Sequence, residues 1–264
     1  MPEEIVDLGI TSPPYNKQEK NNGGLVSNVI YSSYRDKLPE DEYQTQQIKV
    51  LNELFRVTKS GGSFFYNHKI RWVNGDMYHP MDWLRKTEWT VKQEIIWDRT
   101  IAGNIRGWRF WQVEERIYWL YKPLNGNKKG KELESKYAKL TSIWRAIPEN
   151  NNPHPAPFPL WLPVRIILSL LGDSGKGLVL DPYAGSGTTA LATKILGFDF
   201  LGIDISKEYI DYARNRIKNY KNEMGKVEKE RELHFIKKTF KERKEDGSYK
   251  PHYRKKECAS LFPK

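Results

Sequence analysis

The stretch Gly177-Leu-Val-Leu-Asp181-Pro-Tyr-Ala-Gly-Ser-Gly187-Thr-Thr-Ala-Leu-Ala192 decides the fold. Its first five residues are typical of a buried strand and those from Thr188 onward of a helix, so the glycines between them form a tight turn. The start of that helix offers N–H groups to an anion. The following apolar stretch ends in Asp204, where an acid can accept hydrogen bonds from ribose hydroxyls. These features predict a site for a nucleoside-bearing cofactor at the end of a strand.

The rest of the chain alternates strand and helix patterns. We expect strands at 5–11, 63–66, 90–97, 116–121, 177–181 and 198–204, and helices at 41–56, 80–86, up to about 171, 188–196 and 207–221. This alternation predicts an α/β fold with a doubly wound, mostly parallel sheet of the Rossmann-like kind.

Composition favours a folded protein in a reducing compartment. The 264 residues are 38% hydrophobic and 13% aromatic, and the single cysteine, Cys258, excludes a disulfide framework and a cysteine-rich zinc site. Arg165 interrupts the most apolar segment before it reaches the roughly 18 residues of a membrane span. His68, His79 and His154 do not have a metal-binding spacing. We therefore expect a cytoplasmic protein, prokaryotic or phage-like, with no metal and no membrane contact.

The net charge of +11 favours a polyanionic partner. Residues 218–264 hold 15 Lys and Arg against 8 Asp and Glu, so this tail carries +7 and the remainder +4. Two interpretations are open: a solvated helix with a frayed end, or a basic arm that lies on phosphates. The second predicts that deletion after about Lys221 weakens DNA binding more than cofactor binding.

The segment Thr11-Ser-Pro-Pro-Tyr15 ends the first expected strand. Pro13 and Pro14 fix the backbone and expose carbonyls without competing N–H donors. Ser12 adds a hydroxyl acceptor and Tyr15 a flat ring. Such a corner can accept both hydrogens of an amino group while the ring stacks on the attached heterocycle. Taken alone, the same residues also fit a strand-ending turn with a core tyrosine.

The two motifs together resemble the β-class amino-methylating DNA methyltransferases. Thr11-Ser-Pro-Pro-Tyr15 is similar to their catalytic motif, and Asp181-Pro-Tyr-Ala-Gly-Ser-Gly187 to their S-adenosylmethionine motif, which usually has Phe where this chain has Tyr183. The catalytic motif comes first, which is the circularly permuted order of that class. The resemblance covers about residues 5 to 217. It implies a class I methyltransferase fold, double-stranded DNA as substrate and a place in a restriction–modification system.

The resemblance implies that the chain is divided into four functional parts. Residues 1–97 would form the catalytic half, 98–153 core strands with a target-recognition insertion, 154–217 the S-adenosylmethionine-binding half and 218–264 the basic tail. It also implies methyl transfer to the amine of a flipped-out base, with hydrogen bonds to the Ser12 hydroxyl and the Pro13 carbonyl and stacking on Tyr15. The residues it assigns to the cofactor are Asp181, Tyr183, Gly185, Gly187, Thr188 and Asp204, with Asp181 expected to orient the amino group of the cofactor and Asp204 to hold the ribose.

Two cues bear on the target base. Ser12 in the first motif position resembles the N4-cytosine enzymes, whereas N6-adenine members more often have Asp. The segment His154-Pro-Ala-Pro-Phe-Pro159 leans the same way. We favour cytosine N4 over adenine N6.

Basic residues between the core strands are candidates for DNA contact. They are Arg99, Arg106, Arg109, Lys128 and Lys129. Asn104-Ile-Arg-Gly-Trp-Arg109 is loop-like, and we expect it to contact DNA, whereas Trp119 and Tyr121 alternate as core strand residues do. The polar loop from Lys17 to Leu38 is a further candidate.

Three alternatives stay open. A nicotinamide-dependent oxidoreductase could use Gly185-x-Gly187-x-x-Ala190, but it leaves Ser12 to Tyr15 unexplained. A non-catalytic DNA-binding subunit is suggested by a departure from the class, since only four residues precede Ile5 where a strand and a helix are usual. The tail around Leu233-His-Phe-Ile236 or a partner subunit could supply the missing elements, or truncation could have removed them; a homodimer or a partner subunit is therefore an open expectation. Methylation of RNA or of an amide is the third alternative.

Overall fold

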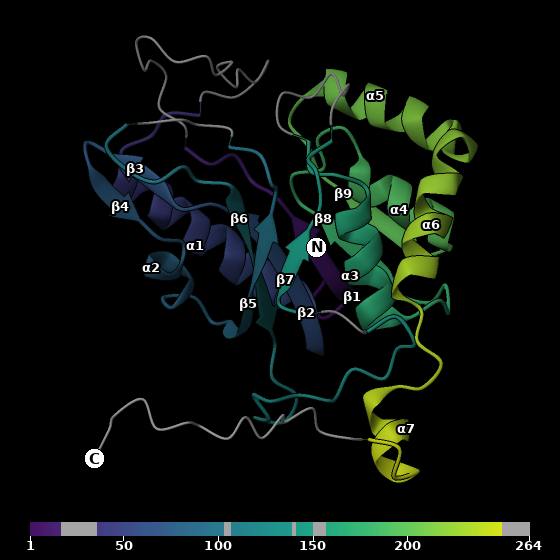
Figure 1. Ribbon diagram of the computed structural model, residues 1–264. Helices are drawn as coiled ribbons and strands as arrows, with labels where there is room; N and C mark the ends of the chain where they lie inside the picture. The colour runs from purple at the N-terminus through teal and green to yellow at the C-terminus, as the bar shows by residue number, and fades with distance from the viewer. Residues whose placement is uncertain (17–35, 103–106, 139–140, 150–156, 250–264) are drawn as a thin grey trace, which may run out of the picture.

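The computed structural model describes residues 1–16, 36–102, 107–138, 141–149 and 157–249. A seven-stranded sheet runs through them in the order β7-β5-β6-β2-β1-β8-β9 (Figure 1). The strands are β1 (Val6–Thr11), β2 (Thr58–His68), β5 (Thr90–Asp98), β6 (Glu114–Tyr121), β7 (Ile143–Arg145), β8 (Leu178–Asp181) and β9 (Asp199–Gly202). β1 is parallel to β2 and β8, β8 to β9, and β5 to β7, whereas β6 is antiparallel to β2 and β5. The expected doubly wound, mostly parallel sheet is confirmed.

Helices cover both faces of the sheet (Figure 1). Helices α1 (Glu40–Val57) and α2 (Met81–Leu84) lie on one face, and α3 (Trp161–Leu171), α4 (Thr188–Leu196) and α6 (Met224–His234) on the other. Successive residues of β2 serve the two faces: Phe64 and Tyr66 pack in the cluster with α1, and Phe65 packs in the cluster with α3. This is the period of two that a strand imposes on its side chains. Helix α5 (Lys207–Lys218), the 3-10 turn η1 (Tyr220–Glu223) and α7 (Phe240–Glu245) complete the elements after β9.

Three strands were not expected. β3 (Arg71–Val73) and β4 (Asp76–Tyr78) form a hairpin directly after β2, and β7 adds an edge strand beside β5. β2 also starts earlier than expected, at Thr58, because α1 ends without an intervening loop. The Thr58 hydroxyl donates to the Leu54 carbonyl at 2.7 Å and so closes the helix. Gly61 lies inside this strand, with φ +84°.

The first part of the expected tail, up to the end of α6, is attached to the core. Helix α6 packs against α3, Val227 is fully buried, and Arg165 Nε donates to Glu230 Oε1 at 2.6 Å. Helix α6 is thus anchored to the core through Val227 and Glu230, while most of its other side chains stay exposed, so this stretch is neither a wholly solvated helix nor a detached basic arm. The packed core does not end at the boundary drawn at 218.

The segment after α6 does not supply an extra strand of the sheet. The Ile236 N–H donates to the Lys136 carbonyl, and the Phe235 ring meets Tyr137 edge-on. Residues 250–264 and most of the loop from Lys17 to Leu38 lie outside the described ranges. Within those ranges, no helix combines the length and apolar character that a bilayer crossing requires.

Candidate active site

The carboxyl ends of β1 and β8, which are neighbours in the sheet, bring the two sequence motifs together. The Thr11 hydroxyl donates to Asp181 Oδ1 at 2.7 Å. Asp181 also accepts from the Thr189 hydroxyl at 2.7 Å and from the Tyr183 N–H at 3.1 Å. Burial raises the pKa of Asp181 to about 6, although these hydrogen bonds act to lower it. Asp181 thus joins the end of β1 to the glycine turn from inside the protein.

The turn after β8 requires glycine at position 187. Gly187 has φ +73°, and a Cβ built there would lie 2.6 Å from the Cβ of Ala213 on α5. Asp204, at the end of β9, accepts from the Gly185 N–H through Oδ2 and from the Ser206 N–H through Oδ1, both at 2.8 Å. No side chain caps the start of α4. An uncapped helix start beside a glycine turn and a half-buried carboxylate fits a ligand with an anionic end and a ribose.

Arg216 on α5 links the start of α4 at Thr188 to Glu223 in the 3-10 turn η1. It is buried, and its Nη1 donates to the Thr188 hydroxyl at 3.0 Å. Its other nitrogens donate to Glu223 at 2.8 and 3.1 Å and to Glu149 at 3.1 Å. The Thr188 hydroxyl, which we predicted to hold the cofactor, therefore also has a protein partner.

A polar cluster lies under the Ser12 corner. The Ser12 and Tyr15 hydroxyls are 2.7 Å apart, and the Tyr15 hydroxyl donates to Glu115 Oε2 at 3.0 Å. Asn67 Nδ2 lies 2.7 Å from the Tyr15 hydroxyl, 3.0 Å from Glu115 Oε2 and 3.3 Å from Ser12 Oγ. Arg99 Nη1 completes the cluster with an ion pair to Glu115 Oε1 at 2.6 Å.

The Tyr15 ring is held by aromatic neighbours. Only 7% of Tyr15 is exposed, and its ring centroid lies 4.5 Å from that of the buried His68. Tyr43 on α1 donates its hydroxyl to the Pro14 carbonyl at 2.8 Å and lies 2.7 Å from His68 Nε2. His68 is therefore packed behind the corner, in contact with Tyr15 and Tyr43.

Sequence reasoning missed Asn67 and Glu115. Asn67 follows the apolar stretch Phe64-Phe-Tyr66 and therefore lies at the carboxyl end of β2, next to β1. Glu115 is in β6, opposite Trp97 of β5. A polar residue just after a buried strand was a usable signal for Asn67. The sequence carried no comparable signal for Glu115, because its role depends on the antiparallel placement of β6.

The five predicted DNA-binding residues are not in one place. Arg99 lies in the polar cluster under Ser12, and Arg106 falls outside the described residues. Arg109 follows β5 at the edge of the sheet where Ser12 lies, and its guanidinium lies 3.9 Å from the centroid of the Trp72 ring. Lys128 and Lys129 are exposed beyond the other end of β6, at the edge opposite Ser12. Trp119 and Tyr121 are buried, as expected.

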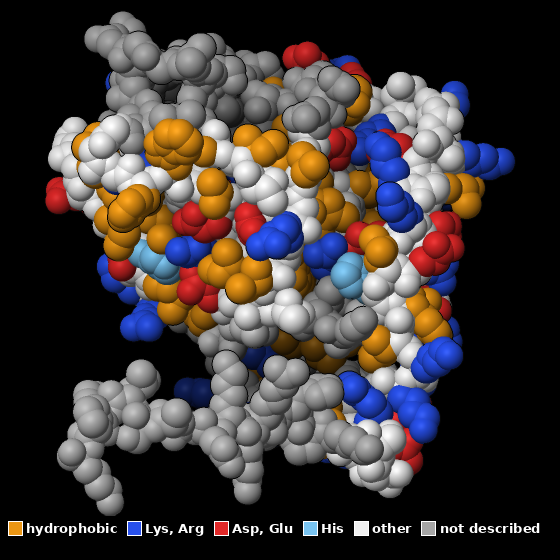
Figure 2. Space-filling view, in the orientation of Figure 1, with side chains coloured by type: hydrophobic (Ala, Val, Ile, Leu, Met, Phe, Trp, Pro, Cys, Tyr) orange, Lys and Arg blue, Asp and Glu red, His pale blue; other side chains and the backbone are white. Residues whose placement is uncertain are grey.

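Exposed aromatic side chains surround Arg109. Phe110 is 99% exposed, Trp108 60% and Trp111 59%. On the face shown in Figure 2, hydrophobic side chains gather over the β3–β4 hairpin, whose Trp72 lies against Arg109. We call Gly107-Trp-Arg-Phe-Trp111 the aromatic segment.

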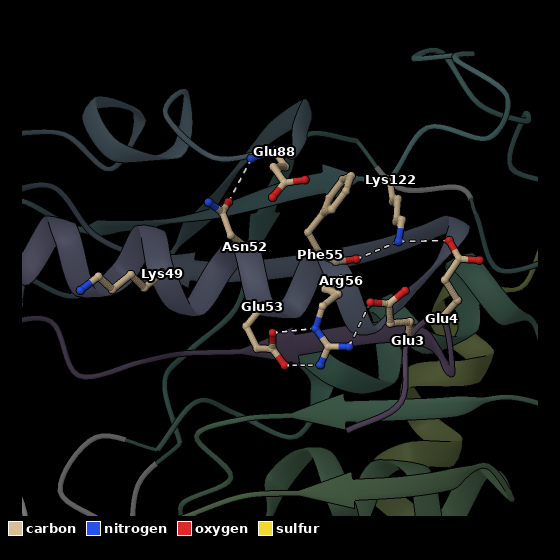
Figure 3. A pocket seen from close by; sticks show the side chains of 9 residues that line it. All are labelled: Glu3, Glu4, Lys49, Asn52, Glu53, Phe55, Arg56, Glu88 and Lys122. Carbon is tan, nitrogen blue, oxygen red and sulfur yellow. Dashed lines mark hydrogen bonds and ion pairs between the residues drawn. The ribbon is translucent and has the colours of Figure 1, made fainter.

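A separate hollow lies far from these motifs, at the end of α1 near the start of β1 (Figure 3). Arg56 pairs there with Glu53 and Glu3, and Lys122 with Glu4. Its lining is mostly charged, and neither motif contributes a residue. Among the described residues, no group of three His, Cys, Asp or Glu could hold a metal ion.

Comparisons with known proteins agree with this geometry. The model of the N6/N4 DNA methylase family matches residues 6–215. The Type II methyltransferase M.ScaI of Streptomyces caespitosus is 28% identical over 250 residues, which cover 82% of this chain and 76% of that protein. M2.DpnII of Streptococcus pneumoniae is also 28% identical, over 82% of this chain and 84% of the relative.

Solved structures share the fold. The cytosine-N4-specific PvuII DNA methyltransferase has a TM-score of 0.64 at 17% identity, covering 84% of this chain and 86% of that one. The M1.HpyAVI–SAM complex has a TM-score of 0.55 at 26% identity, covering 81% and 90%. Both motifs and the whole sheet lie within the matched range, and the chain belongs to the N6/N4 DNA methylase family.

Proposed function

We propose that this protein is a Type II DNA methyltransferase of a bacterial restriction–modification system, working in the cytoplasm, and that it methylates N4 of cytosine. The observation that carries the proposal is the placement of Ser12 at the carboxyl end of β1, joined to the glycine turn through the Thr11–Asp181 hydrogen bond of 2.7 Å. A hydroxyl acceptor thus lies beside a turn suited to a nucleoside ligand.

The methyl donor of the family is S-adenosylmethionine, which supplies an electrophilic methyl group when bound. Gly185, Gly187 and the uncapped start of α4 at Thr188 suit its charged methionine end. Asp204 keeps a lone pair on each oxygen beyond its bonds to Gly185 and Ser206, which suits ribose hydroxyls. Asp181, whose two oxygens already accept three bonds from the protein, acts by holding the turn in place. We assign Tyr183, next to it, to the wall of this site.

The chain's own contribution to the reaction is the geometry of the amine. The nitrogen of an exocyclic base amine is planar and conjugated, so its lone pair is poorly available. Hydrogen bonds from this amine to the Ser12 hydroxyl and the Pro13 carbonyl would pull the nitrogen toward a tetrahedral geometry and aim its lone pair. The work is orientation and electrostatics. No covalent bond to the base is required.

The base must leave the duplex to reach Ser12. We assign the stacking contact with the base to the Tyr15 ring, whose centroid lies 4.5 Å from that of His68. Cytosine is favoured because Ser12 stands where adenine-methylating members more often carry Asp. Adenine N6 is the second candidate, since its amine could make the same two hydrogen bonds.

The aromatic segment, on the catalytic edge of the sheet, is the proposed DNA contact. Arg109 supplies a cation for a phosphate or a guanine edge, and Trp108 and Phe110 expose rings that can stack or wedge. Lys128 and Lys129 lie at the other edge and are left out of this surface.

The test is methyl transfer from isotopically labelled S-adenosylmethionine to unmethylated duplex DNA by the purified chain. We expect label in DNA with the native protein and only a small residual rate with Ser12→Ala, which keeps its affinity for S-adenosylmethionine in calorimetry. Label in RNA alone would redirect the proposal to RNA. Binding of NAD but not of S-adenosylmethionine would support the oxidoreductase instead, and cofactor binding without transfer would support a non-catalytic subunit.

A further inference from the structure

We infer that Glu115 is a positioning residue that sets the direction of the hydrogen-bond chain ending at Ser12. It makes Ser12 present a lone pair, rather than its hydroxyl hydrogen, to the target amine. The inference rests on the proposed function, because it concerns how the same corner receives an amine.

The chain begins at an acceptor that cannot donate. Glu115 is 7% exposed and paired with Arg99 at 2.6 Å, so it is held as a carboxylate. An ionised carboxylate only accepts hydrogen bonds. The Tyr15 hydroxyl, 3.0 Å from Glu115 Oε2, therefore gives its single hydrogen to Glu115.

The direction of the next bond follows. Ser12 Oγ and the Tyr15 hydroxyl are 2.7 Å apart, and either oxygen could be the donor in isolation. Because the hydrogen of Tyr15 is committed to Glu115, Ser12 donates and Tyr15 accepts. Ser12 is left with lone pairs only, and one of them receives at most a long contact of 3.3 Å from Asn67 Nδ2. A base amine is a donor at this point, so it meets an acceptor.

The orientation of Asn67 is consistent with this direction. Its Nδ2 faces Glu115, Tyr15 and Ser12, while its Oδ1 is buried without a hydrogen-bond partner among the described residues. A flipped amide would place Oδ1 against the Glu115 carboxylate and set two acceptors against each other. The amide keeps the orientation that serves the carboxylate, which indicates that the charge of Glu115 dominates the cluster.

Without the carboxylate, the chain loses its fixed direction. A glutamine at 115 can turn its amide nitrogen toward Tyr15 and donate to it. Tyr15 could then donate to Ser12, whose own hydrogen would be free to point at the amine hydrogens. Binding of the cofactor, in a different part of the sheet edge, does not depend on this choice.

The experiment compares Glu115→Gln and Tyr15→Phe with the native protein in steady-state methylation of DNA. Tyr15→Phe keeps the ring and the Arg99–Glu115 pair, so it tests the chain even where Glu115→Gln lowers stability. We expect each variant to lower kcat by about tenfold to a hundredfold, since a hydrogen bond to a charged group is being lost. The Kd for S-adenosylmethionine should stay within about twofold. Glu114→Gln, one residue earlier on β6 and outside the cluster, is the matched control and should keep the native kcat.

The same two substitutions made in the Ser12→Ala protein distinguish an effect of Glu115 through Ser12 from a purely structural role of Glu115. If Glu115 acts through Ser12, Glu115→Gln and Tyr15→Phe should cause no further loss of rate there, because the hydroxyl whose direction they set is absent. Two results would overturn the inference and leave the proposed function standing. In the first, the native protein is active and both single variants keep its kcat. In the second, each substitution lowers the rate by the same factor in the native and in the Ser12→Ala protein. Absence of turnover by the native protein would overturn the proposed function and this inference with it.

Discussion

Replacing Glu230 by alanine would leave the Arg165 guanidinium buried between α3 and α6 without its carboxylate. Both side chains are 8% exposed, and the two charged groups approach to 2.6 Å. Removing one partner of a buried pair costs about 3–5 kcal/mol. We expect the lower end, about 3 kcal/mol, because the stacking of Arg165 on Trp161 at 4.3 Å remains. For a domain of this size, such a loss lowers Tm by roughly 6–12 °C.

The effect should depend on pH in a defined direction. Burial acts to raise the pKa of Glu230, but hydrogen bonds from His234 and Arg165 outweigh it and lower the pKa below the usual 4.5. The folded pKa is thus lower than the unfolded one, so the ion pair contributes fully above pH 4.5 and is lost as the pH falls through the folded pKa. The difference in Tm between the native protein and Glu230→Ala should therefore narrow below pH 4.5.

Thermal unfolding followed by circular dichroism measures both effects. Glu228→Ala is the matched control, because Glu228 lies on the same helix, is half exposed and pairs only with Arg231 within its own turn. That change should alter stability by less than about 0.5 kcal/mol. Equal Tm values for the two variants would refute the view that α6 is part of the core.

Three further predictions concern the site. Gly187→Ala places a side chain at φ +73° against Ala213. It should weaken S-adenosylmethionine binding in calorimetry by tenfold or more, on the order of 1.4 kcal/mol. Native affinity in this variant would contradict the prediction. Asp181→Asn should abolish a fall in unfolding free energy between pH 3.8 and about 6, because the folded carboxyl keeps its proton up to about pH 6 whereas the unfolded one loses it near pH 3.8. A fall of equal size in the variant would contradict this. Arg109→Ala should weaken DNA binding and reduce its salt slope by about 1 while the affinity for S-adenosylmethionine stays unchanged, and an unaltered salt slope would remove Arg109 from the DNA surface.

Elements decided by local pattern were predictable from the sequence. The strand, turn and helix around Gly185 and Gly187 were expected, because periodicity and glycine chemistry act within a few residues. The corner from Ser12 to Tyr15 was expected at a strand end for the same reason. The hydrogen bond between Thr11 and Asp181 spans 170 positions, and only the pairing of β1 with β8 brings the two together.

Elements decided by tertiary contacts were not predictable. Helix α6 reads as a charged, exposed segment, and its helical pattern carries almost no apolar face. It is buried at one point only, where Val227 and the Glu230–Arg165 pair meet α3. Deletion after Lys221 removes that contact, together with the Glu223 that holds Arg216 against Thr188. We now expect this deletion to abolish cofactor binding, whereas the charge of the tail alone had suggested a loss of DNA binding.

The central claim is that Ser12 directs methylation to the N4 amine of cytosine. Mass analysis of the nucleosides from duplex DNA, after reaction with the purified chain and S-adenosylmethionine, tests it most directly. We predict N4-methylcytosine in DNA treated with the native protein and at most a small residual amount with Ser12→Ala. N6-methyladenine as the modified nucleoside would contradict the choice of base, and no modified nucleoside at all would contradict the proposed activity.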